Sequence, residues 1–261
     1  MRVSLEGKRA VVCGSTQGIG RACAHELAAA GAQVTLVARN VERLTEVQAS
    51  LPRPSDQSHE ILVADFSDPS GLDASVRAHA SAAPRHILIN NTGGPPGGRA
   101  IDASPEEYLD AYSKHLICNQ ILARALVPGM TSEGYGRIIN IISTSVREPI
   151  PNLGVSNTTR GAVASWAKTL SRELGPHGIT VNNVLPGFTE TQRLDSLMAA
   201  RAQREGIEKE TLLAQLAESV PARRFAMPEE TAYAICFLAS PLAAYISGVS
   251  LPVDGGRLNG I

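Results

Sequence analysis

The sequence lacks several features that would point to whole classes of protein. Its 261 residues contain no run of about 18 apolar residues, so no membrane-spanning helix is predicted. The formal net charge is only -1, which argues against nucleic acid or an anionic membrane as a partner. The first eight residues lack the apolar centre of a signal peptide. We therefore expect a cytoplasmic protein whose partners are small molecules.

Cysteine is also scarce. The four cysteines, Cys13, Cys23, Cys118 and Cys236, form no Cys-x-x-Cys pair and lie in segments typical of buried strands or helices. They predict neither a disulfide framework nor a zinc site, and no other residues predict a metal site. Apolar material is plentiful, since 43% of the residues are hydrophobic and 19% charged. We expect residues 1–261 to form a single α/β domain.

A glycine-rich turn organises the chain. An apolar strand is predicted at 10–13, and an alanine-rich helix ends at Ala30. Between them lie Gly14, Ser15, Thr16, Gln17, Gly18, Ile19 and Gly20. Glycines at these spacings let the backbone approach a ligand, and the first helical turn offers free N–H groups to an anion. The pattern predicts a pyrophosphate site, although such turns also occur in proteins that bind no nucleotide.

Strands alternate with helices along the rest of the chain. Further strands are predicted at 33–38, 61–64, 86–89, 137–142 and 179–184, with a closing strand and turn within 248–256. Helices are predicted at 41–50, from about 69, and at 105–130, 154–174 and 228–239. This alternation of apolar strands with helices predicts a doubly wound parallel sheet, the Rossmann fold.

The end of the second predicted strand bears on the choice of cofactor. Ala38 stands where an acidic residue would hydrogen-bond a free ribose 2′-hydroxyl, and Arg39 follows it. An arginine there accommodates a 2′-phosphate through charge-assisted contacts. The pair favours NADP, with NAD as second choice. The alternative is a solvated arginine at a strand end.

Taken in order, these motifs resemble the short-chain dehydrogenase/reductase family over Leu5 to Gly256. The resemblance implies that Asp65, with Phe66 beside it, meets the adenine, although Asp65 or Asp68 can instead cap the helix near Pro69. It also implies further cofactor contacts, along the ribose, the nicotinamide carboxamide and the diphosphate, at Asn91, Thr92, Gly93, Pro186, Gly187, Thr189 and Thr191.

The catalytic positions depart from the family's pattern. The family has a Ser at the end of the fifth strand, a Tyr thirteen positions later and a Lys four beyond the Tyr. This sequence has Ser143, Ser156 and Arg160 at those positions, and no Tyr lies between Tyr135 and Tyr233. The family's helix Asn is replaced by His115. Of the four expected catalytic residues, only Ser143 is kept.

These replacements differ in their chemical consequences. Arg160 can still bind a ribose and supply positive charge, but a guanidinium does not relay a proton. The Ser156 hydroxyl is shorter than a phenol and a weaker acid. If hydride chemistry persists, another proton donor is needed, and the ordinary pKa of His115 suits that role, either directly or through a water molecule. The alternative is a structural histidine in the interior of a helix.

The segment 193–220 is charged and helical in pattern, and the resemblance makes it part of a substrate lid at about 189–225. Arg201, Arg204, Arg223 and Arg224 can meet an anionic ligand there or form a solvated face. The resemblance also implies a homotetramer.

Two functions remain open. One is an atypical NADP(H)-dependent oxidoreductase acting on a carbonyl or a secondary alcohol, and the other is a catalytically silent dinucleotide-binding sensor or subunit. A lyase or hydratase has no positive support from the residues.

Overall fold

One parallel sheet forms the centre of the protein. The computed structural model describes residues 3–260, and its seven strands lie in the order β3-β2-β1-β4-β5-β6-β7. Every pairing between neighbouring strands is parallel. The strands are β1 Arg9–Cys13, β2 Gln33–Ala38, β3 Glu60–Val63, β4 Ile87–Asn90, β5 Gly136–Ile141, β6 Ile179–Pro186 and β7 Ser250–Val253. The predicted doubly wound sheet is confirmed, with strand ends shifted by one or two residues.

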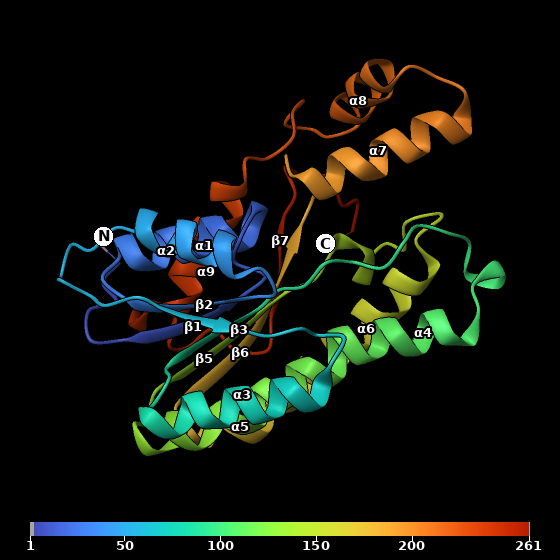
Figure 1. Ribbon diagram of the computed structural model, residues 1–261. Coiled ribbons are helices and arrows are strands. Elements are labelled where there is room, and N and C mark those ends of the chain that lie inside the picture. The colour runs from blue at the N-terminus through green and yellow to red at the C-terminus, as the bar shows by residue number, and fades with distance from the viewer. Residues whose placement is uncertain (1–2, 261) are drawn as a thin grey trace.

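Helices cover both faces of the sheet (Figure 1). On one face lie α1 Gly18–Ala29, α2 Val41–Ser50 and α9 Pro228–Ala239, and on the other lie α3 Pro69–Ala82, α5 Cys118–Ser132 and α6 Gly154–Leu174. Each face has its own buried hydrophobic cluster. Val12 belongs to the α1 and α9 side, and its neighbour Val11 to the α3 and α5 side. Strands buried on both faces explain the continuous apolar runs in the sequence.

The four cysteines are buried and free, as predicted for core residues. Burial raises the pKa of the Cys13 thiol to about 12, so this group stays uncharged at neutral pH. Within residues 3–260 no helix is long and apolar enough to cross a membrane.

A ladder of side-chain hydrogen bonds, from three asparagines to one serine, crosses the four strands β4 to β7. Asn90 donates to Asn140 over 2.8 Å, Asn140 donates to Asn183 over 3.0 Å, and Asn183 donates to Ser250 over 3.1 Å. Each pair also faces its partner in the backbone register of the sheet. Because all three asparagines are buried, a slip of one strand would leave amides unpaired in the interior. The ladder therefore fixes the register of β4 to β7.

The long helix predicted at 105–130 is interrupted. It consists of α4 Pro105–Tyr112, a π-helical turn at Ser113–Ile117 (η2) and α5. The N–H of Cys118 donates to the carbonyl of Ser113, five residues earlier, which adds one residue to the turn. The apolar spacing continues through this segment, so the sequence pattern gives no sign of the insertion. The π turn carries His115 and buries it.

The lid segment also differs from its prediction. It forms two helices, α7 Gln192–Glu205 and α8 Lys209–Glu218, because Gly206 adopts the left-handed conformation at φ 66° and ends the first. Met198, Ala202 and Leu212 form a small cluster between them. Figure 1 shows both helices standing away from the two helical layers, above the end of β7.

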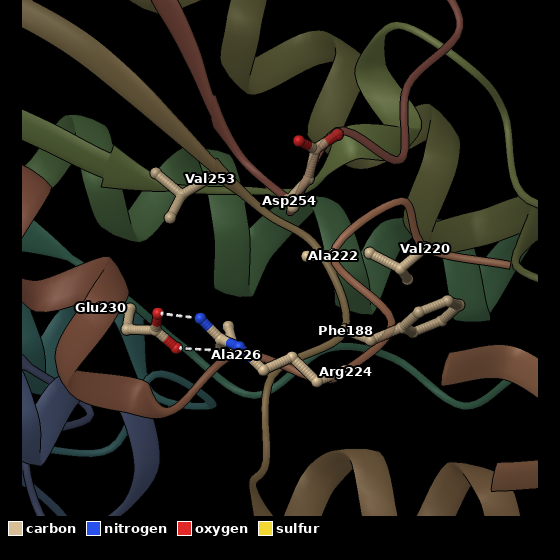
Figure 2. A pocket seen from close by; sticks show the side chains of 9 residues that line it. Phe188, Val220, Ala222, Arg224, Ala226, Glu230, Val253 and Asp254 are labelled. Carbon is tan, nitrogen blue, oxygen red and sulfur yellow. Dashed lines mark hydrogen bonds and ion pairs between the residues drawn. The ribbon is translucent and has the colours of Figure 1, made fainter. Parts of the chain in front are cut away.

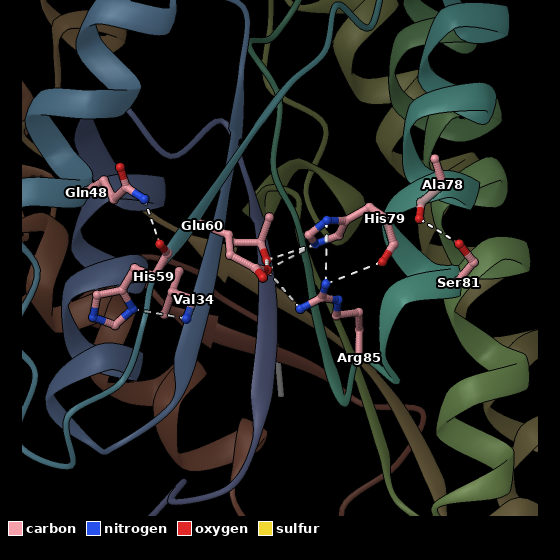
Figure 3. Close-up of polar contacts among 9 residues, drawn as sticks. Val34, Gln48, His59, Glu60, Ala78, His79, Ser81 and Arg85 are labelled. Carbon is pink, nitrogen blue, oxygen red and sulfur yellow. Dashed lines mark hydrogen bonds and ion pairs between the residues drawn. The ribbon is translucent and has the colours of Figure 1, made fainter.

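A charged network between β3 and α3 supports the sheet away from the candidate site (Figure 3). The Arg85 guanidinium, only 2% exposed, donates to Glu60 over 2.9 Å. The buried Thr35 hydroxyl donates to the same carboxylate over 3.0 Å and lies 3.0 Å from His79 Nε2. Burial and Arg85 lower the pKa of His79, so its neutral ring donates to Thr35 through Nε2.

Removing the Glu60 carboxylate should destabilise the protein. Glu60→Ala leaves the buried Arg85 cation without a counter-charge, and we expect a loss of about 2–3 kcal/mol of unfolding free energy in urea. Asp73→Ala is the matched control, because it breaks the exposed Arg77–Asp73 pair and should cost under about 0.5 kcal/mol. Equal losses in the two variants would contradict this interpretation.

Candidate active site

The glycine turn forms a cradle at the carboxyl end of β1. Gly14 and Gly18 have positive φ angles of 59° and 53°. A Cβ at Gly20 would lie 2.1 Å from the Gly14 carbonyl oxygen, so only glycine fits there. Gln17, which precedes α1, makes no side-chain cap, and the first turn of α1 has no acidic residue. The N–H groups at the start of α1 are therefore free to bind an anion.

Three of the predicted cofactor-binding segments meet at this cradle. The Asn91 side chain donates to the carbonyls of Cys13 and Gly14, each over 3.3 Å. The methyl group of Thr191 would lie 3.1 Å from a Cβ at Gly18. Ser15 is fully buried and bonds to the Val37 carbonyl, which makes it a structural residue of the turn. Thr16, Ile19 and Thr92 are partly exposed and Gly93 is exposed.

Asp65 and Asp68, at the predicted adenosine end of the site, make different contacts. Asp68 caps α3 by accepting a hydrogen bond from the Gly71 N–H over 3.0 Å. One carboxylate oxygen of Asp65 accepts a hydrogen bond from the Ser67 N–H, and the other lies 3.9 Å from Arg39 Nη1. The side chains of Arg39 and Asp65 are 73% and 46% exposed. The backbone carbonyl of Phe66, next to Asp65 in the chain, accepts a hydrogen bond from the Cys118 thiol. The residues predicted for the adenosine thus lie at one edge of the sheet.

Ser143 and Arg160 approach each other at the end of β5. Ser143 follows the strand, and its hydroxyl oxygen accepts a hydrogen bond from the Ser145 N–H over 3.1 Å. Arg160 comes from α6, and its Nη1 donates to the Ile141 carbonyl over 3.1 Å, two residues before Ser143. Ser156 lies one turn earlier on α6 and is 9% exposed. Burial lowers the pKa of Arg160 to about 10, and Arg193 adds to this shift.

His115 lies close to this group but has an altered acidity. Its side chain is 4% exposed. Burial, followed by the charge of Arg160, lowers its pKa to about 3, and a hydrogen bond with the Gly93 backbone only partly opposes the shift. The neutral ring is therefore favoured at neutral pH. The hypothesis that His115 is a general acid assumes an ordinary pKa, and burial lowers this pKa.

Arg193 is a site residue that sequence reasoning misses. A Cβ at Gly94 would lie 3.3 Å from Arg193 Nη2 and 3.5 Å from Arg160 Nη2, so two guanidinium groups flank one glycine. Arg193 also donates to the Pro95 carbonyl. Arg193 lies two residues after Thr191, a predicted cofactor-binding residue, and in the first turn of α7. This proximity in the sequence is the signal that could have identified Arg193 as a site residue.

The four lid arginines singled out from the sequence are occupied elsewhere. Arg201 and Arg204 pair with Glu205, and Arg224 pairs with Glu230 through both carboxylate oxygens. Arg223 donates to the Glu218 carbonyl. These contacts favour the solvated-face interpretation over an anion site.

The loop after β6 ties the lid to the sheet. The Gly187 N–H donates to the Val253 carbonyl over 2.9 Å, and a Cβ at Gly187 would lie 2.7 Å from Asp254 Cα. Pro186 ends β6, and the buried Thr189 forms a bridge to Ala226. Figure 2 shows the cavity beside this junction, with the Arg224–Glu230 pair on its wall. At about 70 Å³ it is smaller than typical ligand pockets, and it includes none of the predicted catalytic residues.

An open parallel sheet with a glycine turn and polar side chains gathered at its carboxyl edge defines a dinucleotide-binding α/β protein.

A family model described as enoyl-(acyl carrier protein) reductase matches residues 14–257. The 3-oxoacyl-[acyl-carrier-protein] reductase FabG of Escherichia coli (strain K12) is 35% identical over 257 residues, covering 97% of this chain and 98% of the relative. The short-chain reductase protein NovJ of Streptomyces niveus is 32% identical over 251 residues, covering 95% and 93%.

A solved structure agrees with these matches. L-sorbose reductase from Gluconobacter frateurii, complexed with NADPH and L-sorbose, superposes with a TM-score of 0.93 at 34% identity, covering 100% of both chains. This chain belongs to the short-chain dehydrogenase/reductase family.

The low pKa of His115 predicts a pH dependence of stability. Between the unfolded histidine pKa of about 6.5 and the folded value of about 3, the unfolded chain binds one more proton. Stability should therefore fall as pH falls below about 6.5, by up to about 1.4 kcal/mol per pH unit from this residue. His115→Asn should lose about 2 kcal/mol less than the wild type between pH 6.5 and 4.5, measured by urea unfolding. Parallel pH profiles for the two proteins would contradict the low pKa.

Proposed function

We propose that this chain is an atypical NADP(H)-dependent oxidoreductase that interconverts a carbonyl compound and a secondary alcohol. The observation that carries the proposal is the placement of Ser143 and Arg160 at the same edge of the sheet as the glycine cradle. The relatives support it, since the Gluconobacter reductase is described as a complex with NADPH. The identity of the substrate goes beyond this proposal.

The residues at the cradle fit a dinucleotide. The diphosphate would lie against the free N–H groups of α1, where a side chain at Gly14 or Gly20 would collide with its neighbours. Arg39 would hold the 2′-phosphate, Asp65 the adenine, and Asn91 to Gly93 with Arg160 the nicotinamide ribose. Pro186 to Thr191 would meet the carboxamide and the diphosphate. When bound, the nicotinamide supplies the hydride to a ketone or accepts it from an alcohol.

The chain's own groups would stabilise the substrate oxygen. The Ser143 oxygen already accepts a hydrogen bond from Ser145, which leaves its O–H free to donate to the carbonyl oxygen. Arg160 would place a fixed positive charge beside the developing alkoxide without giving up a proton. Because His115 is neutral at neutral pH, we assign the final proton to solvent water and give His115 a role in holding the Gly93 backbone.

The test is hydride transfer itself. Deuterium from NADPH labelled at C4 should appear stereospecifically in the product of at least one member of a panel of ketones. Ser143→Ala should lower kcat by about 100- to 1,000-fold, because it removes a donor to the alkoxide. Ser165→Ala, an exposed serine on the same helix as Arg160, is the matched control and should not change kcat.

The failure of that test has two distinct forms. Tight binding of NADPH with no label transfer would favour a catalytically silent sensor or subunit. Two features point that way, since Ser156 stands where the family has its Tyr and the neutral form of His115 is favoured at neutral pH. Failure to bind either NADPH or NADH would overturn the cofactor assignment.

Arg39 should decide between the two nucleotides. Arg39→Ala removes the cation beside the expected 2′-phosphate, and we expect NADPH affinity to fall about 10- to 100-fold while NADH affinity changes less than about threefold. Arg53→Ala, in the loop after α2, is the control. Fluorescence titration measures both constants, and an equal loss for the two nucleotides would contradict the assignment.

We also infer that residues 1–261 form one cytoplasmic domain with a lid at about 189–225, and that it assembles as a homotetramer. Exposed apolar side chains support the assembly. Leu109 is 69% exposed and lies on α4, near Tyr112 and Ile117 in the chain, and Tyr245 is fully exposed just before β7. Exposed apolar groups at two separate places are typical of interfaces in an oligomer.

A further inference from the structure

The reactive end of the site holds two cations whose charges no acid balances. Arg160 Nη2 and Arg193 Nη2 both lie within 3.5 Å of the point where a Gly94 Cβ would stand. Arg160 comes from α6 and Arg193 from α7, so the two groups reach this point from different parts of the chain. Like charges repel each other, and Arg193 contributes to the lowered pKa of Arg160.

The hydrogen bonds of these two arginines go to uncharged groups. Arg160 donates to the Ile141 carbonyl and Arg193 to the Pro95 carbonyl. In the part of the chain that the structure describes, neither forms an ion pair with a carboxylate. The nearby His115 is neutral at neutral pH, and Lys114 is paired with Asp110. The net charge around Gly94 is therefore positive.

Most other cations of the lid pair with a carboxylate, and Arg223 donates to the Glu218 carbonyl. Arg201 and Arg204 pair with Glu205, Lys209 pairs with Asp195, and Arg224 pairs with Glu230. Arg193 is thus the lid cation that turns toward the reactive end with its charge unbalanced. The Arg193 side chain is exposed and Arg160 is half-buried, so an anion that binds between them would meet both charges.

Two anions could meet Arg193, and its position favours one. The cofactor diphosphate would lie at the start of α1, where the side chain near Gly18 is Thr191. Arg193 instead points to Gly94, beside Arg160 and the end of β5 that carries Ser143. An anion held there would belong to the molecule whose carbonyl meets Ser143.

We infer that Arg193 binds the carboxylate of the substrate, which makes the substrate class oxo acids and the corresponding hydroxy acids. This inference rests on the proposed oxidoreductase function. The planar guanidinium matches a carboxylate through two parallel hydrogen bonds. Arg193 lies in the first turn of α7, so binding the acid would also hold the lid over the substrate.

The test uses binding without turnover. 2-Oxo and 3-oxo acids of four to six carbons, and the methyl ester of each, are titrated by calorimetry into the protein saturated with NADP⁺. No hydride can move in that complex. At least one acid should bind about 10- to 100-fold more tightly than its ester. Arg193→Met should remove this difference, Arg193→Lys should restore part of it, and Arg201→Met, a paired arginine of the same helix, should leave it unchanged.

Each other result overturns the inference. If no acid binds, or acid and ester bind equally to the wild type, Arg193 does not recognise a carboxylate. If Arg193→Met weakens NADP⁺ binding tenfold and leaves the acid-to-ester ratio unchanged, Arg193 belongs to the diphosphate. If the acid binds through Arg193 and no panel member accepts hydride from NADPH, the oxidoreductase proposal fails while the carboxylate assignment stands.

Discussion

The parallel register of the central strands is the constraint on which the rest of the site depends. Backbone pairing and the ladder of Asn90, Asn140, Asn183 and Ser250 hold β4 to β7 at one alignment. All carboxyl ends consequently reach the same edge of the sheet, which is where open α/β sheets bind ligands. The glycine cradle, Ser143 and the Pro186–Gly187 loop come together there although they are far apart in the sequence.

Arg85 differs from Arg160 and Arg193 in the groups that it contacts. Arg85 lies away from the cradle and is paired with Glu60 in a network of ordinary hydrogen bonds (Figure 3). Arg160 and Arg193 meet only carbonyl groups. A charge that is balanced within the chain supports stability, whereas one left unbalanced at the ligand-binding edge attracts an anion.

The predicted replacement of the family's phenol and lysine by Ser156 and Arg160 would change how an alkoxide is stabilised. A phenol gives up its proton, while a guanidinium offers fixed charge and hydrogen bonds. The π turn buries His115, and both the burial and the charge of Arg160 lower its pKa, which favours the neutral imidazole. These groups fit the proposal that the site stabilises an oxyanion by charge and hydrogen bonds and that no side chain donates the proton.

The sequence by itself determined the sheet, its helical layers and the cradle, because apolar periodicity and glycine spacing are local signals that tertiary context did not override. It did not reveal the π turn at His115, since the apolar spacing continues through that turn. Nor did it reveal the break at Gly206 or the position of Arg193 beside Arg160. Only the tertiary structure decided the pKa of His115 and which lid arginine faces the site, because burial and charge pairing depend on groups distant in the chain.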